Sequence, residues 1–156
     1  MNNAFSQIVS IIIAALILFL MPLSFLYGRT DNLRQMYVMT QTEYFVDSVC
    51  NTGFLSKEMY EQYLRSISDK GAVYTVEITR ETPVYTYTSE GYEKSYEYYD
   101  TDEIVAALEC GERYYFFKGD FIRAEVIKVS DINVFTRKFS KGTECYCGGQ
   151  IKYETY

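Results

Sequence analysis

Histidine and tryptophan are both missing from this chain of 156 residues, and proline occurs only twice. The lack of histidine removes the commonest general base and the commonest metal ligand among side chains. The 15 lysines and arginines form no cluster and are outnumbered by 21 aspartates and glutamates. Nucleic acid is therefore not an expected partner, because phosphate binding requires concentrated positive charge.

Motifs that carry chemistry are missing as well. The chain has no phosphate-binding glycine loop, no nucleophile elbow, no dinucleotide fingerprint and no metal motif built on histidine. Asp100, Asp102 and Glu103 are close in sequence, but acids at the start of a predicted helix stabilise the helix dipole and need no catalytic role. The sequence therefore predicts neither an enzyme nor a cofactor.

Charge of either sign is absent from the apolar run between Ile8 and Gly28. As a helix, this run matches the roughly 30 Å of a bilayer's hydrocarbon core. Pro22 and two serines are tolerated there, because hydroxyls can bond to the backbone and proline merely kinks the helix. The chain thus divides into a tail (1–7), a transmembrane helix (8–28), a helical extension (29–53) and a globular domain (54–156).

A cleavable secretory signal would need a basic start, a shorter apolar run and a small-x-small cleavage site. Residues 1–7 contain no lysine or arginine, and the exit at residues 24–28 contains bulky side chains. We therefore expect a retained, single-pass anchor. Its small residues Ala4, Ala14 and Ala15 are the positions where neighbouring helices would pack closely. Arg29 and Arg34 follow the run, and by the positive-inside rule they weakly favour a cytoplasmic C-terminal domain.

Apolar periodicity predicts three helices. The first extends the apolar run without a break, from about Phe5 to Asn51, and ends at Gly53. The second begins after an N-cap at Ser56 and ends at Gly71. The third spans 101–109 and starts with a capping box formed by Asp100 and Glu103. The stripe that should bury the first helix against the domain consists of Val38, Thr42, Phe45, Val46 and Val49.

Alternating residues predict strands in the remainder of the domain. The first covers 72–79 and is broken by Pro83, and further strands follow at 84–88 and 96–99. A two-residue turn at Gly119-Asp120 predicts a hairpin between 113–118 and 121–129. A last pair, 134–139 and 144–153, contains a bend or bulge at Gly148-Gly149. Helices followed by strands predict an α+β fold, with an antiparallel sheet packed on the second half of the long helix.

Four cysteines, Cys50, Cys110, Cys145 and Cys147, form a possible disulfide or thiol cluster. An exported domain would favour disulfides, and a cytosolic one would favour free thiols or a metal site. Cys145 and Cys147 share one side of an extended segment. The main alternatives are one disulfide or four buried thiols. A zinc site is disfavoured, because two of its ligands would be isolated.

Tyrosine is the most unusual component, with 17 residues. The alternation of tyrosine and threonine from Val84 to Thr88 suits an ordinary pleated sheet, with one ring face packed and the hydroxyl at the water edge. The sharper hypothesis is an adhesive or subunit-contact surface, because tyrosine provides a large contact area at low entropic cost.

Three short segments carry a resemblance to a known family: FVDSVCNTGFLS (45–56), YFFKGDF (115–121) and GGQIKYE (148–154). They are similar to small pilin-like proteins encoded with Tad-type secretion genes in Firmicutes. The long helix with a small sheet on its distal half also resembles type IV pilins and pseudopilins. The family's processing signal is not matched, since no glycine precedes Phe5 and Val9 stands where glutamate is usual.

This resemblance implies a cytoplasmic N-terminus, an extracytoplasmic domain and a non-catalytic role as a minor subunit of a surface pilus or secretion assembly. The implied partners are the lipid bilayer, other pilin-like subunits and assembly-platform proteins. The alternative is a membrane-tethered binding or sensor module of the cell envelope, whose tyrosine-rich sheet holds a ligand.

Overall fold

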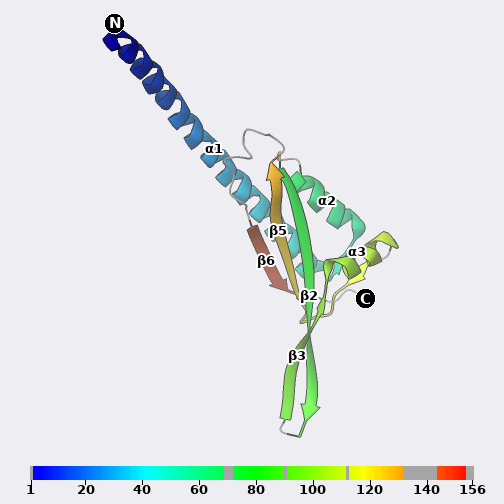
Figure 1. Ribbon diagram of the computed structural model, residues 1–156. Coiled ribbons are helices and arrows are strands. Elements are labelled where there is room, and N and C mark those ends of the chain that lie inside the picture. The colour runs from blue at the N-terminus through cyan, green and yellow to red at the C-terminus, as the bar shows by residue number, and fades with distance from the viewer. Residues whose placement is uncertain (1, 69–71, 90, 112, 132–143, 154–156) are drawn as a thin grey trace.

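A computed structural model describes residues 2–68, 72–89, 91–111, 113–131 and 144–153, and it confirms an α+β fold (Figure 1). The elements in chain order are α1 (Asn2–Thr52), β1 (Phe54–Leu55), α2 (Lys57–Ser68), β2 (Ala72–Thr88), β3 (Gly91–Tyr99), α3 (Thr101–Glu109), β4 (Tyr114–Tyr115), β5 (Phe121–Asp131) and β6 (Glu144–Gln150). The predicted strand 134–139 and Gly71, the predicted end of the second helix, lie outside the described residues.

The first helix is a single element of 51 residues, as the periodicity predicts. Gly53 ends it with φ 75°, a conformation that side chains disfavour, and donates its N–H to the Val49 carbonyl at 2.8 Å. The start of α2 also agrees, because the Ser56 hydroxyl accepts the Met59 N–H at 3.3 Å. Local sequence signals were therefore sufficient to place both helix boundaries.

The main sheet is antiparallel, with the strand order β3-β2-β5-β6. The second half of α1 crosses this sheet over β6 and β5, and α2 lies beside α1 on the same side (Figure 1). One face of the sheet and all three helices supply the core, which includes Val38, Val49, Ile67, Ile78, Ile104, Leu108, Ile122 and Val126. All five residues of the predicted stripe on α1 are buried.

Close contact between α1 and β6 depends on glycine. Gly148 and Gly149 pair in regular register with Arg123 and Ile122, so the predicted bend or bulge at this pair is wrong. A Cβ atom on Gly149 would lie 2.8 Å from the Cys50 sulfur, closer than carbon and sulfur can pack. The missing side chain at this position, rather than a special backbone angle, is what the packing requires.

The predicted hairpin between 113–118 and 121–129 is also wrong. β4 pairs instead with β1, and the Phe116 N–H donates to the Gly53 carbonyl at 2.9 Å, so this segment holds the end of α1. A turn does form at Gly119, where φ is 100° and the Asp120 N–H bonds to the Phe117 carbonyl at 3.0 Å. After this turn, β5 lies between β2 and β6. These longer strands offer β5 more backbone hydrogen bonds than the two residues of β4 could.

Pro83 does not break β2, which continues through it to Thr88, contrary to the prediction. The pairing of β2 with β5 ends at Glu81, so no described strand lies beside Pro83 on that side. Opposite residues of an antiparallel pair alternate in hydrogen bonding. Counting from the Thr88–Gly91 pair that closes the turn, Pro83 falls where no N–H is donated to β3. Proline is tolerated at such an edge position.

The capping box of α3 is wrong in its mechanism. Asp100 is the N-cap residue, but its side chain makes no capping hydrogen bond. The next residue forms the local contact instead: the Thr101 hydroxyl accepts the Ile78 N–H at 2.7 Å and donates to the Ile78 carbonyl at 3.1 Å. The pairing of β3 with β2 ends at Arg80, so Thr101 satisfies the N–H and carbonyl of Ile78, which the sheet would leave unpaired on that side.

A buried ion pair joins the sheet to the turn before β5. Arg80 Nε lies 2.7 Å from Asp120 Oδ2, and their side chains are only 8% and 2% exposed. The guanidinium lies 5.0–5.7 Å from the ring centroids of Tyr99, Tyr114, Phe116 and Phe117. The same Asp120 oxygen accepts the Phe117 N–H at 2.9 Å. Each charge is therefore compensated inside the protein.

Removing one charge of this pair should destabilise the domain strongly. We expect Asp120→Asn to cost about 3–5 kcal/mol, because Arg80 would remain buried without a counter-ion. Urea unfolding of the full chain in detergent micelles, followed by circular dichroism, measures the change. Arg65→Gln is the matched control, because it breaks the Arg65–Glu61 pair on the surface and should cost about 0.5 kcal/mol or less. Equal costs for both variants would contradict the structural role of the buried pair.

The contact between α1 and β6 gives a second expectation. Gly149→Ala should destabilise the domain by about 1–3 kcal/mol, because the added methyl overlaps the Cys50 sulfur. Cys50→Ala removes that sulfur, so the double variant should recover part of the loss. A double-mutant cycle on urea midpoints measures the coupling. Additive effects would show that Cys50 does not limit the space at Gly149.

Candidate functional site

The N-terminal half of α1 is the largest exposed apolar surface in the described part of the chain. Residues Ala4–Leu26 have a mean hydropathy of 2.8, and none of the apolar window is buried. A soluble surface does not leave so many large aliphatic side chains in water. By length and composition this helix can cross a membrane, and a signal sequence has the same properties. The structure is therefore consistent with a membrane anchor or a signal sequence.

The predicted helix-packing alanines are all exposed. Ala4 and Ala15 are eleven residues apart, close to three helical turns, so they lie on nearly the same face. Ala14 lies about 100° away from Ala15 around the helix axis. The backbone remains helical through Pro22, and the Ser24 hydroxyl donates to the Leu20 carbonyl at 2.8 Å. One face of the helix therefore presents Ala4 and Ala15, two of the three small residues, to a neighbouring helix.

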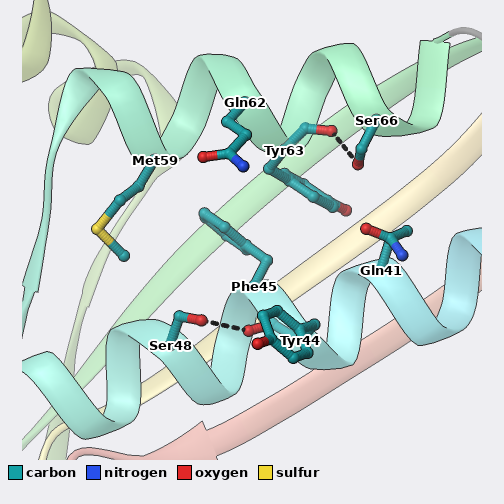
Figure 2. A pocket seen from close by; sticks show the side chains of 8 residues that line it. All are labelled: Gln41, Tyr44, Phe45, Ser48, Met59, Gln62, Tyr63 and Ser66. Atoms are coloured by element: carbon teal, nitrogen blue, oxygen red, sulfur yellow. Dashed lines mark hydrogen bonds between the residues drawn. The ribbon is translucent and has the colours of Figure 1, made fainter.

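A groove separates α1 from α2 near the end of the long helix (Figure 2). Its volume is about 150 Å³, and its lining residues are Gln41, Tyr44, Phe45, Ser48, Met59, Gln62, Tyr63 and Ser66. The Phe45 and Tyr63 rings stack between the helices, with centroids 4.3 Å apart. The Tyr63 hydroxyl lies 2.9 Å from the Thr42 hydroxyl, and burial raises the pKa of Tyr63. These contacts hold the two helices together, and the groove is below the usual size of a ligand site.

All four cysteines are free thiols. Cys145 and Cys147 share one face of β6, as their spacing predicts, and this face meets α1. Cys50 is buried over Gly149. The alternative of one disulfide is therefore not realised, and that of four buried thiols is wrong for Cys110, which is exposed at the end of α3. Among the described residues, no group of three or more His, Cys, Asp or Glu side chains could hold a metal ion.

Burial makes three of these thiols less acidic. It raises the pKa of Cys50 and Cys145, and it raises the pKa of Cys147 to about 11. The thiolate is the reactive form, so a higher pKa lowers reactivity at neutral pH. These cysteines have the properties of core residues rather than of a redox centre.

The tyrosine-rich segment forms a surface that sequence reasoning described only in part. Beyond Glu81 the pairing with β5 has ended, and β2 and β3 continue as a two-stranded ribbon, residues 82–88 and 91–97. Figure 1 shows it projecting from the body at the end opposite the start of α1. The expectation of one packed ring face is wrong here, since the tyrosines near its tip are well exposed. The turn residues Ser89-Glu90-Gly91 between two tyrosine-rich strands were the sequence signal that could have indicated this ribbon.

Neither a protein family model, a curated protein nor a solved structure matches the chain. Function must therefore be inferred from the surfaces themselves.

The thiols give an expectation that tests their burial. A maleimide that cannot cross membranes should label folded protein at Cys110 alone, and Cys110→Ser should abolish this labelling. At pH 8, Cys147 should hold about a hundred-fold less thiolate than a cysteine whose pKa has the ordinary value of 9.0. Mass spectrometry of labelled peptides, before and after unfolding in urea, measures both effects. Rapid labelling of Cys145 or Cys147 in the folded state would contradict the burial.

Proposed function

We propose that this protein is a single-pass membrane protein and a non-catalytic, pilin-like minor subunit of a surface pilus or secretion assembly. The observation that carries this proposal is the division of α1. The apolar window within Ala4–Leu26 is not buried at all, while residues from Val38 onward supply the core of the domain. One rigid element thus joins a segment suited to lipid or to other helices with a folded domain.

Helix continuity favours an anchor over a signal sequence. A cleavable secretory signal ends in a cleavage site of small residues. Here the backbone is helical from Asn2 to Thr52, which includes the exit from the apolar segment. The sequence at that exit, Ser24-Phe25-Leu26, places bulky side chains where small ones are needed. Both features support retention of the apolar half in the mature protein.

We further propose that the domain is extracytoplasmic and that the N-terminus is cytoplasmic. This orientation rests on the family resemblance and opposes the weak signal of Arg29 and Arg34. From Leu26 to Val38, where α1 begins to supply the core of the domain, the helix rises about 18 Å, so it would hold the sheet clear of the bilayer's hydrocarbon core. Subunits standing in this way could pack side by side through the exposed half of α1, as helices in membranes pack through small residues.

A second candidate function has its own supporting observation. A membrane-tethered binding module of the cell envelope would present its ligand surface far from the bilayer. The ribbon of β2 and β3 projects at the end of the domain opposite the N-terminal end of α1 (Figure 1). Binding at the ribbon and assembly through α1 use different surfaces, so one protein could perform both.

Anchoring and assembly can be tested on the same chain. The protein in membranes should retain residues 8–28, detected by mass spectrometry of its peptides, and should resist carbonate extraction. Ala15→Asp together with Leu16→Asp should release it, because each charge at mid-membrane costs about 2.5–3.5 kcal/mol. Leu33→Asp, on the exposed helix beyond the apolar segment, is the control and should leave it in the membrane. A mature chain that lacks residues 1–28 would overturn the anchor.

Photo-crosslinking from a photo-reactive residue at position 18, in native membranes, tests the assembly half of the proposal. Cross-links to further copies or to pilus-type neighbours are expected, and they should decrease when Ala4 and Ala15 are both replaced by Leu. A chain that stays in the membrane but cross-links only to lipid would overturn assembly while leaving the anchor intact.

A further inference from the structure

The two faces of the β2–β3 ribbon differ sharply in chemistry. Side chains alternate along each strand, and the cross-strand pairs Tyr85–Lys94 and Tyr87–Tyr92 lie on one face. The tyrosine face, as we call it, consists of Tyr85, Tyr87, Tyr92, Lys94 and Tyr96 of the ribbon and of Tyr98 at its base, where Tyr98 pairs with Glu81. Its five tyrosines are 46–79% exposed. The opposite face carries mainly threonine, serine and glutamate, namely Thr82, Thr86, Thr88, Glu93, Ser95 and Glu97.

This chain provides little to support the ribbon. An isolated pair of strands is only marginally stable in water, and an exposed aromatic surface of this size is usually covered by a partner. The rings do contact one another, since Tyr87 and Tyr92 meet edge to face at 5.4 Å. In this geometry the edge of one ring covers part of a face of the other, and the two residues remain 76% and 79% exposed.

Charge is also separated between the two faces. Among the described residues of the tyrosine face, Lys94 carries the only positive charge, and its Nζ lies 4.8 Å from the Tyr96 ring and 5.8 Å from the Tyr85 ring. A hydrogen bond to Tyr96 raises the pKa of Lys94, so the amine remains charged at neutral pH. Glu93 and Glu97 lie on the opposite face, and Glu81, the partner of Tyr98 on the tyrosine face, forms an ion pair with Arg123 at 2.9 Å. The tyrosine face is thus complementary to an anion, although the whole chain has a net charge of -6.

The side-chain types discriminate between classes of partner. Tyrosine is also common in protein–protein interfaces, so self-association through this face is the competing outcome that the test must exclude. A sugar ring has an apolar C–H face that stacks on tyrosine and a rim of hydroxyls that bonds to the phenols. With one cation for five rings, the face matches a polymer in which charged sugars alternate with neutral ones better than it matches a nucleic acid, which is charged at every unit.

We propose that the tyrosine face binds an acidic glycan, a chain of stacked sugar rings of which some carry a carboxylate or phosphate group. The rings of Tyr85, Tyr87, Tyr92, Tyr96 and Tyr98 supply the stacking surface, and Lys94 pairs with the acidic group. This inference goes beyond anchoring and assembly, and it depends on neither. Its position on the ribbon directs the surface away from the bilayer in the proposed orientation.

The test uses the full chain in a detergent without a sugar headgroup. Immobilised hyaluronan oligosaccharide, with one carboxylate per two sugars, is the acidic probe, and its carboxyl-reduced form is the neutral one. Biolayer interferometry should show tighter binding to the acidic probe, weakening as salt rises. Lys94→Gln should weaken acidic binding about two- to five-fold and remove the preference, and Lys94→Arg should restore it. Tyr92→Ala should weaken both probes at least about five-fold.

Two control variants separate the face from general effects. Tyr153→Ala removes an exposed tyrosine elsewhere, and Thr86→Ala alters the opposite face of the ribbon, so both should bind as the unmodified chain does. Circular dichroism of each variant verifies folding. Equal binding of both glycans with no effect of Lys94→Gln, preference for oligo(dT), or no glycan binding would each overturn the proposal. So would loss of a dimer, measured by light scattering, as the only effect of Tyr92→Ala.

Discussion

The buried pair between Arg80 and Asp120 constrains several parts of the domain at once. Arg80 lies at the position where β2 leaves the four-stranded sheet and continues as the ribbon. Asp120 lies in the turn that begins β5, and its backbone carbonyl accepts the N–H of Ile151 at 2.9 Å. Removing two charges from water is costly, so the surrounding aromatic rings and hydrogen bonds must hold both side chains in place. This requirement links the end of the sheet, the segment after α3 and the C-terminal segment in a single arrangement.

The same arrangement also supports the end of the long helix α1. The Lys152 N–H bonds to the Cys50 carbonyl at 3.1 Å, and the Phe116 N–H bonds to the Gly53 carbonyl at 2.9 Å. Both bonds hold the last turn of α1 against segments adjoining the ion pair. The helix is therefore fixed at one end only, and its apolar half extends free of the domain. A rigid helix held in this way would fix the position of the sheet and its ribbon relative to a membrane or an assembly.

Helices could be predicted closely, because their signals are local. The period of the apolar stripe and the conformational freedom of Gly53 act within a few residues of chain, and both agree with the structure. Strand pairing failed where it depended on distant partners. The turn at Gly119 is real, yet β5 pairs with β2, about forty residues earlier, because long strands satisfy more backbone groups than a short local hairpin does. Likewise Pro83 was tolerated because β5 begins only at Phe121, opposite Glu81, and because the Pro83 position donates no N–H to β3.

What the sequence determined by itself was therefore the uncharged helix, its continuation into a buried stripe and the α+β order, all of which are set by hydrophobic periodicity. Only the tertiary structure decided what the tyrosines and cysteines do. Cys145 and Cys147 face α1 as core residues, whereas Cys110 remains exposed. Tyr85 and Tyr92 share one open face because β2 and β3 extend past β5, and strand alternation cannot reveal where a neighbouring strand ends.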